Sequence, residues 1–300
     1  MNKINFKFII IASAIVIIAG VILFYQKNED SVQPFDKEKV VKEYQAVLVE
    51  SDYNLFYASL EQVDKFDIKK DIRGAIVPHH EVASDYLANF FYSLSENQDV
   101  DTFIILGPNH RDFAAWPAVS AEVYWQTDFG IIYQNEEILS PLVESWQVVY
   151  DKDNFLPEHS IKVIMPFVKN YFPEATVVPI ILTSRHDQVM SRELAEKLAV
   201  YLEDDKTVLL SSLDFSHYLN IETARQNDKI TLQAIYDKDY NLISNFNSDY
   251  LDSPPSLITL LETMDLLDSS GFELVYNSNS GEILGGNMNT TSYIIGYFSK

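Results

Sequence analysis

The residues best suited to metal or proton chemistry in this 300-residue chain are its six histidines. His79 and His80 end the stretch "IVPHH", directly after an apolar run. His110 follows a second apolar run within "LGPNHR", and His217 follows a third within "SSLDFSH". In an open α/β sheet, ligands bind beyond the carboxyl ends of the strands. We therefore expect three separate strands to deliver imidazoles to the same edge.

Other polar residues accompany this group. Asp214 lies at the tip of the run before His217, and His159, in "LPEHSIKVIMPF", is predicted to open a helix at the same edge. His186, in "TSRHD", follows a strand without other polar company. Each histidine alone could be an ordinary loop residue, but their gathering at one edge favours a metal site, since imidazole is the commonest ligand of borderline metals. One histidine of the adjacent pair would face the metal, and its neighbour would either support the ligands from behind or be exposed to solvent.

Alternating sequence patterns predict the elements that position these side chains. Apolar runs rich in Ile, Val and Leu predict strands buried on both faces at residues 72–77, 102–106, 176–182 and 207–213. Helical patterns occupy residues 83–94, 136–148, 160–171, 188–202, 221–236 and 255–267, and two further strands are predicted at 272–276 and 292–298. This alternation predicts an α/β three-layer sandwich with a mostly parallel central sheet flanked by helices.

The N-terminal stretch "FIIIASAIVIIAGVILFY", residues 8–25, is uncharged and about long enough to cross a bilayer. Lys3 and Lys7 precede it, which predicts a cytoplasmic N-terminus. No small-residue cleavage site follows, so a signal anchor is expected, with a cleaved signal peptide as the alternative. We expect a single-pass membrane protein with a cytoplasmic N-terminus and transmembrane helix (1–27), a linker (28–42) and one extracytoplasmic α/β domain (43–300).

The composition excludes several kinds of partner and site. There are 44 acidic residues against 22 basic ones, a net charge of −22, and no Lys/Arg stripe. Such a chain repels phosphate backbones, so no nucleic-acid partner is expected. The chain has no cysteine, so disulfides and thiolate ligands are excluded. A metal site must therefore use His, Asp, Glu or backbone oxygens.

Several stretches, taken in order, resemble the Memo family, also called AmmeMemoRadiSam system protein B, which is related to the class III extradiol dioxygenases. They are "AIVPHH", "FIILGPNHR", "WQTDFG", "EHSIKVIMPF", "LLSSLDFSHY", "YNSNSGEILGG" and "YIIGYF". The resemblance covers residues 74–300. It implies that His79 and His110 bind a divalent transition metal, and that His217 acts as acid or base beside Asp214. Further residues expected at the cleft are His80, Glu158 and His159.

The third metal ligand departs from the family pattern, in which relatives carry cysteine or glutamate. Asp252, in "YLDSPPSL", is the closest candidate by position. A carboxylate suits Fe(II), Mn(II) or Zn(II) better than Cu(I), and the metal stays open among Fe, Zn, Mn and Cu. Alternatively, Asp252 or Ser253 only caps the helix that opens at the two prolines. Lys162 stands where many relatives carry an acidic residue.

Three functions are compatible with these features. The first is an extracytoplasmic metal-dependent enzyme, in particular a redox or dioxygen-using one, with His217 moving protons. The second is a binding module that captures a peptide, a small molecule or the metal without turnover. The third is a membrane-tethered scaffold with a degenerate site. Ring cleavage is a fold-level analogy only, because one fold hosts many functions.

Overall fold

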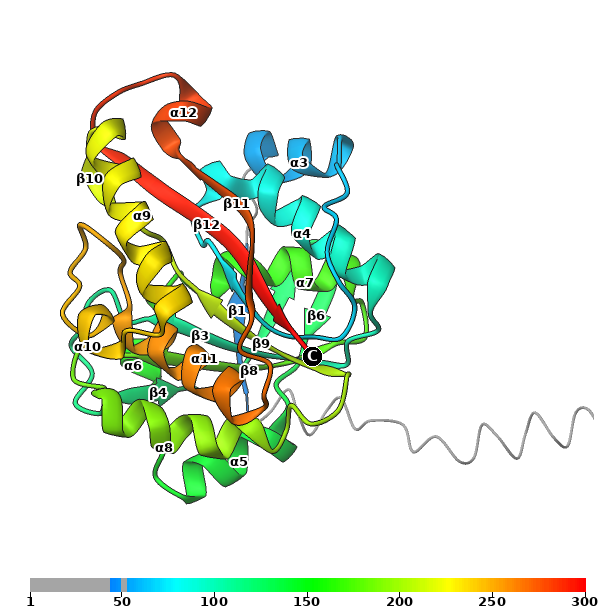
Figure 1. Cartoon of the computed structure of the whole chain (residues 1–300). Helices are drawn as coiled ribbons and strands as arrows, with labels where there is room; N and C mark the ends of the chain where they lie inside the picture. Colours follow the sequence, from blue (N-terminus) through cyan, green and yellow to red (C-terminus); the bar gives the residue numbers. More distant parts are fainter. Residues whose placement is uncertain (1–43, 50–52) are drawn as a thin grey trace, which may run out of the picture. The chain divides into compact units, whose positions relative to one another are not determined.

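The computed structural model describes residues 44–49 and 53–300 (Figure 1). The predicted transmembrane segment at residues 8–25 and the linker at 28–42 lie outside these ranges. Within them, no helix is both long and apolar enough to cross a bilayer. Residues Tyr44–Lys300 form one compact unit.

A nine-stranded sheet forms the centre of this unit. Its strands are β2 (Ile72–Val77), β3 (Thr102–Pro108), β4 (Ala118–Ser120), β7 (Val149–Tyr150), β8 (Thr176–Leu182), β9 (Thr207–Ser212), β10 (His217–Leu219), β11 (Phe272–Asn279) and β12 (Thr290–Ser299). They follow the order β10-β12-β2-β9-β3-β8-β4-β7, and β11 pairs with β12. A second sheet has the order β1-β5-β6 and consists of β1 (Gln45–Leu48), β5 (Val123–Thr127) and β6 (Gly130–Ile132).

Strand direction in the large sheet is mixed, so the prediction of a mostly parallel sheet is confirmed only for its four central strands and for the outer pair β4 and β7. The neighbours β2, β9, β3 and β8 are parallel. Strand β12 runs antiparallel to three neighbours, which are β2, β10 and β11. Strand β4 runs antiparallel to β8. The α/β class is confirmed. The short connection between β11 and β12 suits an antiparallel pair, whereas parallel neighbours need a long crossover. The directions of β12 against β2 and of β4 against β8 depend instead on pairing between segments far apart in the chain.

Helices cover both faces of the central strands (Figure 1). They are α3 (Ala58–Glu61), α4 (Ser84–Asn97), α5 (Glu136–Glu144), α6 (Lys152–Phe155), α7 (Met165–Tyr171), α8 (Gln188–Ala199), α9 (Ile221–Asp237), α10 (Tyr240–Ile243), α11 (Pro254–Leu266) and α12 (Ser280–Leu284). On β3, Phe103 and Ile105 pack into a core shared with α4 and α7, whereas Ile104 and Leu106 pack into one shared with α5, α8 and α11. Burial on both faces explains why these strands read as continuous apolar runs.

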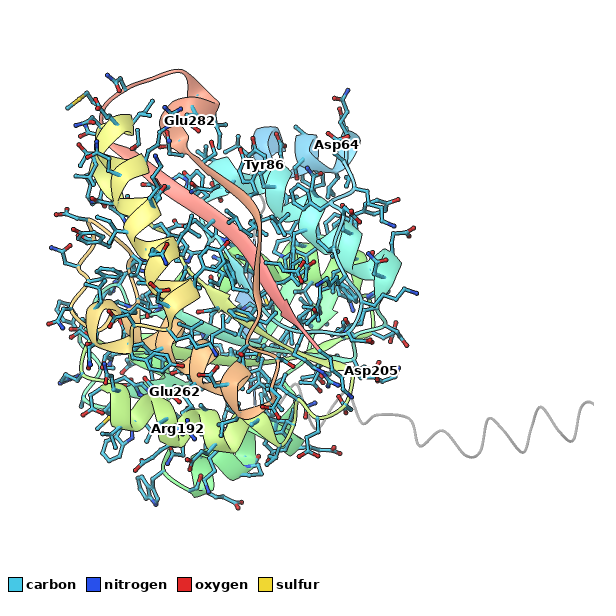
Figure 2. All side chains as sticks on the ribbon, in the orientation of Figure 1. Asp64, Tyr86, Arg192, Asp205, Glu262 and Glu282 are labelled. Carbon is cyan, nitrogen blue, oxygen red and sulfur yellow. The ribbon has the colours of Figure 1, made fainter. Side chains whose placement is uncertain are left out.

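Charged side chains such as Arg192 and Asp205 lie on the outside of this unit (Figure 2). Arg192 lies 2.5 Å from Glu262, and Arg225 lies 2.5 Å from Glu282. The chain has more acidic residues than basic ones, so not every carboxylate can form an ion pair. Asp205 is one of the exposed acidic residues. Exposed pairs of this kind contribute little stability, so the two cores hold the fold.

The parallel register places the strand ends that carry the histidines at one level. Val77 pairs with Ser212, and Leu106 pairs with Ser211. The segments that leave β2, β3 and β9 therefore emerge side by side at the carboxyl edge of the sheet. This is the edge where ligands bind in open α/β sheets.

Candidate metal centre

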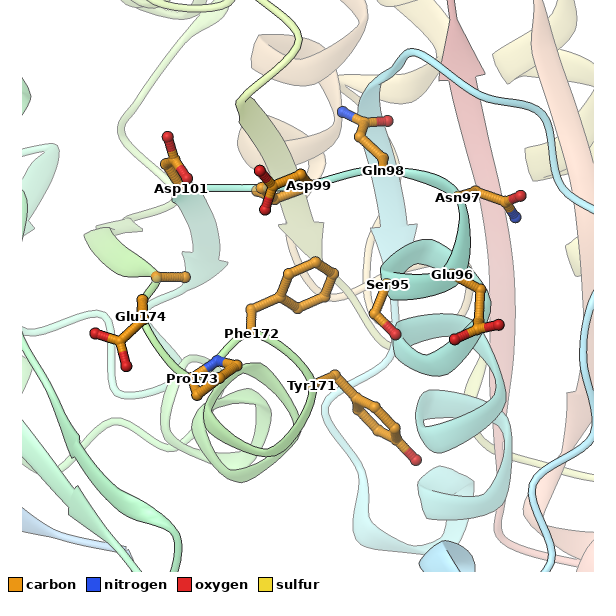
Figure 3. A pocket seen from close by; sticks show the side chains of 12 residues that line it. Ser95, Glu96, Asn97, Gln98, Asp99, Asp101, Tyr171, Phe172, Pro173 and Glu174 are labelled. Atoms are coloured by element: carbon orange, nitrogen blue, oxygen red, sulfur yellow. The ribbon is translucent and has the colours of Figure 1, made fainter. Parts of the chain in front are cut away.

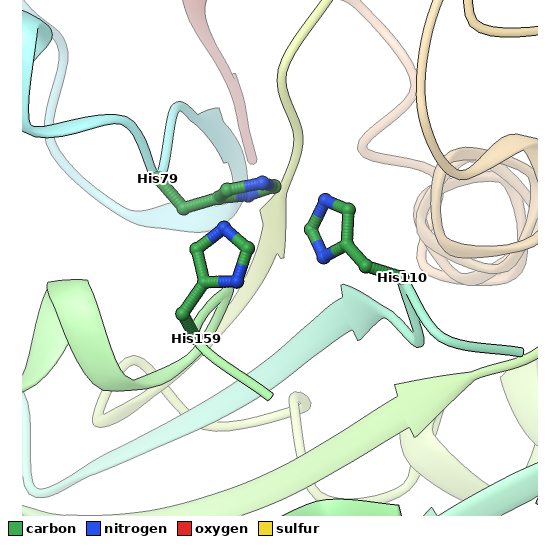
Figure 4. Close-up of side chains that lie close together, drawn as sticks. All are labelled: His79, His110 and His159. Carbon is green, nitrogen blue, oxygen red and sulfur yellow. The ribbon is translucent and has the colours of Figure 1, made fainter. Parts of the chain in front are cut away.

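Three imidazoles converge at this edge (Figure 4). His79 follows β2, His110 follows β3, and His159 precedes α7. One ring nitrogen of each lies within 4.8 Å of those of the other two. The ring centroids of His110 and His159 are 4.5 Å apart, and those of His79 and His110 are 5.2 Å apart. This trio could hold a metal ion.

The proton of His79 is placed by a chain of two hydrogen bonds. Its Nδ1 lies 3.1 Å from Ser212 Oγ, and the Ser212 hydroxyl donates to the carbonyl oxygen of Ser160 at 2.6 Å. A hydroxyl has one proton to donate, so Ser212 accepts from Nδ1–H of the neutral ring. The lone pair then sits on Nε2, which is buried and faces the carboxylate of Asp252 at 3.1 Å. A buried lone pair that faces a carboxylate oxygen is suited to a metal ion, which would bind both atoms.

Glu158 orients the second imidazole. Its Oε1 lies 2.8 Å from His110 Nδ1, and its Oε2 accepts from the backbone N–H of His110 at 2.8 Å. The backbone N–H of Ser160 donates to Oε1 at 2.9 Å. Burial alone would raise the pKa of Glu158, but the hydrogen bond and charge of His110 and the backbone donors lower it to about 2. The ionised carboxylate holds the proton of His110 on Nδ1, which leaves Nε2 for a ligand, as in carboxylate–histidine–metal arrangements.

Asp252 reaches both of these imidazoles. Its Oδ2 lies 3.1 Å from His79 Nε2 and 3.7 Å from His110 Nε2, while its buried Oδ1 has no hydrogen-bond partner among the described residues. The cap of α11 is the neighbouring Ser253, whose Oγ accepts from the backbone N–H of Ser256 at 3.3 Å. Asp252 is thus not the capping side chain, and its carboxylate is available to the centre.

The acidic side chains around the centre favour a positive charge there. Burial lowers the pKa of His110, but the nearby carboxylates of Asp252 and Glu158 outweigh it and raise the pKa to about 10. Burial also opposes protonation of His79, yet the charges of Asp214 and Asp252 raise its pKa above the usual value. A metal cation would satisfy the same carboxylates by replacing these protons.

The other predicted residues lie at or near the same cleft. His217 lines it, and its Nδ1 is buried without a hydrogen-bond partner among the described residues. The Asp214 carboxylate contacts His79: Oδ1 accepts from its backbone N–H at 3.1 Å, and Oδ2 lies 3.8 Å from Nε2. His80 is exposed, and its Nδ1 accepts from the backbone N–H of Val82. Of the adjacent pair, His79 is therefore the one that faces the centre.

Comparison with known proteins identifies the family. The family model described as Memo-like protein matches residues 48–297. The chain belongs to the Memo-like family. A MEMO1 family protein of Thermoplasma volcanium is 28% identical over 233 residues, which cover 75% of this chain and 83% of the relative. One of Sulfurisphaera tokodaii is 31% identical over 193 residues, covering 62% and 68%.

A solved structure also resembles this Memo-like protein. It is the crystal structure of an uncharacterized protein from Escherichia coli K12, with a TM-score of 0.49 and 13% identity, and the match covers 75% of this chain and 99% of that one. A likeness this distant has no bearing on function.

Sequence reasoning missed several residues that shape the cleft of this Memo-like protein, which has a volume of about 470 Å³. Ser160 and Ser212 form the hydrogen bonds described above, but serine is not a residue type that indicates a metal site. The available signal was position, because Ser212 is a polar residue at the end of a wholly buried strand. Tyr218 lines the cleft with a φ of 58°, a left-handed conformation that is uncommon for a residue other than glycine. Such backbone conformations concentrate at functional sites.

A different hollow lies at the amino ends of β3 and β8 (Figure 3). Its lining includes the acidic residues Glu96, Asp99, Asp101 and Glu174, and the ammonium group of Lys206 lies 2.7 Å from Asp99. None of the described residues that line it is a histidine. This hollow therefore offers no imidazole ligand for a metal ion from its described lining.

Proposed function

We propose that this Memo-like protein is a metal-dependent enzyme whose centre is held by His79, His110 and Asp252. The observation that supports it is the convergence of Nε2 of each histidine on Asp252 Oδ2, which lies 3.1 Å from His79 Nε2 and 3.7 Å from His110 Nε2. The other oxygen of this carboxylate, Oδ1, is buried without a hydrogen-bond partner among the described residues. Two histidines and one carboxylate are the ligand set of non-haem iron enzymes, which keeps positions open for substrates. His159 stands beside this set as a further or alternative ligand.

The residues around the metal have distinct tasks in this proposal. Glu158 and Ser212 hold the protons of His110 and His79 on the nitrogens that face away from the centre. Asp214 fixes the position of His79 through its backbone N–H. His217 is placed to hold or transfer a proton at the cleft, since its Nδ1 is buried and unpaired among the described residues.

A bound ferrous ion would supply redox chemistry with dioxygen, and we propose an oxidation related to that of the extradiol dioxygenases. Manganese, zinc and copper are the other candidate ions. The competing function is a binding module, in which the same cleft captures a small molecule or peptide without turnover.

We further propose that residues 8–25 anchor the chain in a membrane, with the N-terminus cytoplasmic and the Memo-like domain on the other side. The uncharged apolar stretch and the preceding lysines support this orientation.

Metal analysis tests the centre directly. The full chain, purified in detergent without a histidine tag, is loaded with Fe(II), Mn(II), Zn(II) or Cu(II) and analysed for bound metal. We expect one ion per chain in the wild type, and loss of most of it in His79→Ala and in His110→Ala. His80→Ala is the matched control and should keep its metal, because His80 is exposed and faces a helix start. A wild-type chain that binds no stoichiometric ion would overturn the proposal.

Oxygen consumption then separates the enzyme from the binding module. With catechols as probe substrates, the metal-loaded wild type should consume oxygen, and His217→Ala should lose turnover while retaining its metal. Full metal occupancy without oxygen consumption by any catechol would instead favour the binding module.

A further inference from the structure

A second cavity adjoins the metal cleft. It has a volume of about 580 Å³, which lies within the usual range for small-molecule sites. Five residues line both spaces: Ser184, Ser248, Asp252, Pro254 and Pro255. A molecule in this cavity would therefore lie beside the proposed centre.

The wall of this cavity contains a buried polar side chain that the proposed chemistry does not use. His186 is only 3% exposed, and neither of its ring nitrogens has a hydrogen-bond partner among the described residues. Burial lowers the pKa of His186 to about 4, against a small opposing effect of Asp187. The ring is thus neutral near pH 7, with one donor and one acceptor. Buried polar groups are normally paired, so this imidazole lacks a partner, and a ligand that displaces the atoms covering its nitrogens would supply one.

The rest of the lining defines the chemistry of that ligand. Phe246, Leu251 and Ile258 provide an apolar wall. Asp187 and Asp252 are the charged groups of the lining, which contains no lysine or arginine among the described residues. Two carboxylates without a cation disfavour an anion, whereas the apolar wall favours a ring.

We propose that this cavity binds a neutral aromatic group bearing a hydroxyl, which forms a hydrogen bond with His186 while the ring packs against Phe246, Leu251 and Ile258. The proposal rests on the proposed function in one respect: the bound group would be the distal end of a molecule whose other end enters the metal cleft. Binding in the cavity itself requires no metal.

The test is a calorimetric titration of the metal-free full chain with 2-naphthol, naphthalene and 2-naphthoate. We expect 2-naphthol to bind best and the anionic 2-naphthoate worst. His186→Leu should weaken 2-naphthol binding about tenfold, the value of one hydrogen bond, without weakening naphthalene. Val189→Trp provides an independent variant, because Val189 is exposed and lines this cavity but not the metal cleft. Its larger side chain should block both 2-naphthol and naphthalene.

Two outcomes would overturn the proposal: no binding of 2-naphthol to the wild type, or equal binding by the wild type and both variants. A loss of naphthalene binding equal to that of 2-naphthol in His186→Leu would refute the hydrogen bond. Metal loading of both variants is measured alongside and should match the wild type. A chain that binds no aromatic probe when metal-free can therefore be distinguished from a chain that binds no metal.

Discussion

Asp252 and Ser253 are neighbours with separate roles, one at the metal centre and one at the start of α11. Asp252→Ala should lower metal affinity at least tenfold, because a ligand oxygen is lost. Ser253→Ala should instead lower the free energy of unfolding by about 1 kcal/mol, as expected for a lost helix cap, and leave metal affinity unchanged. Metal titration and urea unfolding of both variants check this. If Asp252→Ala keeps full affinity, His159 is the third ligand.

His186 should make stability depend on pH. Its pKa is about 4 in the folded protein, below the usual 6.5, so below pH 6.5 the unfolded chain binds the proton more tightly. The stability it contributes is complete above pH 6.5 and is lost as the pH falls towards 4. We expect a loss of about 2 kcal/mol at pH 5 relative to pH 7.

Urea unfolding of the wild type and His186→Leu at both pH values measures this effect. The variant should lose about 2 kcal/mol less between pH 7 and pH 5, since leucine does not titrate. An identical pH dependence in the two proteins would show that the buried imidazole has an ordinary pKa.

At the scale of elements, β3 and the segment that carries Glu158 and His159 are in close contact at Gly107. A β-carbon there would lie 2.6 Å from Ser160 Oγ and 3.1 Å from its Cβ. Gly107→Ala should therefore displace Ser160, which also donates a backbone hydrogen bond to Glu158. We expect a loss of roughly 1–3 kcal/mol in unfolding free energy, typical of overpacking, together with weaker metal binding.

Gly271→Ala is the matched control for this contact. A β-carbon at Gly271 would meet no described atom within 4 Å, and its φ is not in the left-handed region. This variant should match the wild type in thermal stability and metal content. If Gly107→Ala also matches the wild type, then the segment around Ser160 adjusts freely and its close packing does not position the centre.

For the whole molecule, we expect the chain to fractionate with membranes and to expose its Memo-like domain on the outer side. The reason is the apolar stretch at residues 8–25 preceded by Lys3 and Lys7. Protease added to intact spheroplasts should degrade the domain, and deletion of residues 1–26 should release a soluble folded domain. Recovery of the full chain in the soluble cytoplasmic fraction would contradict this orientation.

Local sequence patterns were enough to predict the central strands and the edge that carries the histidines. Residues 72–77 and 176–182 are strands with the predicted bounds, because a strand buried on both faces must be apolar at every position. The gathering of His79, His110 and His217 also followed from local order, since each comes soon after a strand of one sheet.

Tertiary structure decided the direction of the outer strands and the partner of each polar side chain. The pairing of β12 with β2 and the contact of Asp252 with His79 join segments far apart in the chain. Asp214 is an example: its place in the sequence, three residues before His217, gave no sign of the contact between its carboxylate and His79. The proton of His79 likewise depends on Ser212 and Ser160. Residue order limits which segments meet, but hydrogen-bond partners and ligand sets are fixed by distances between segments, which exist only once the chain has folded.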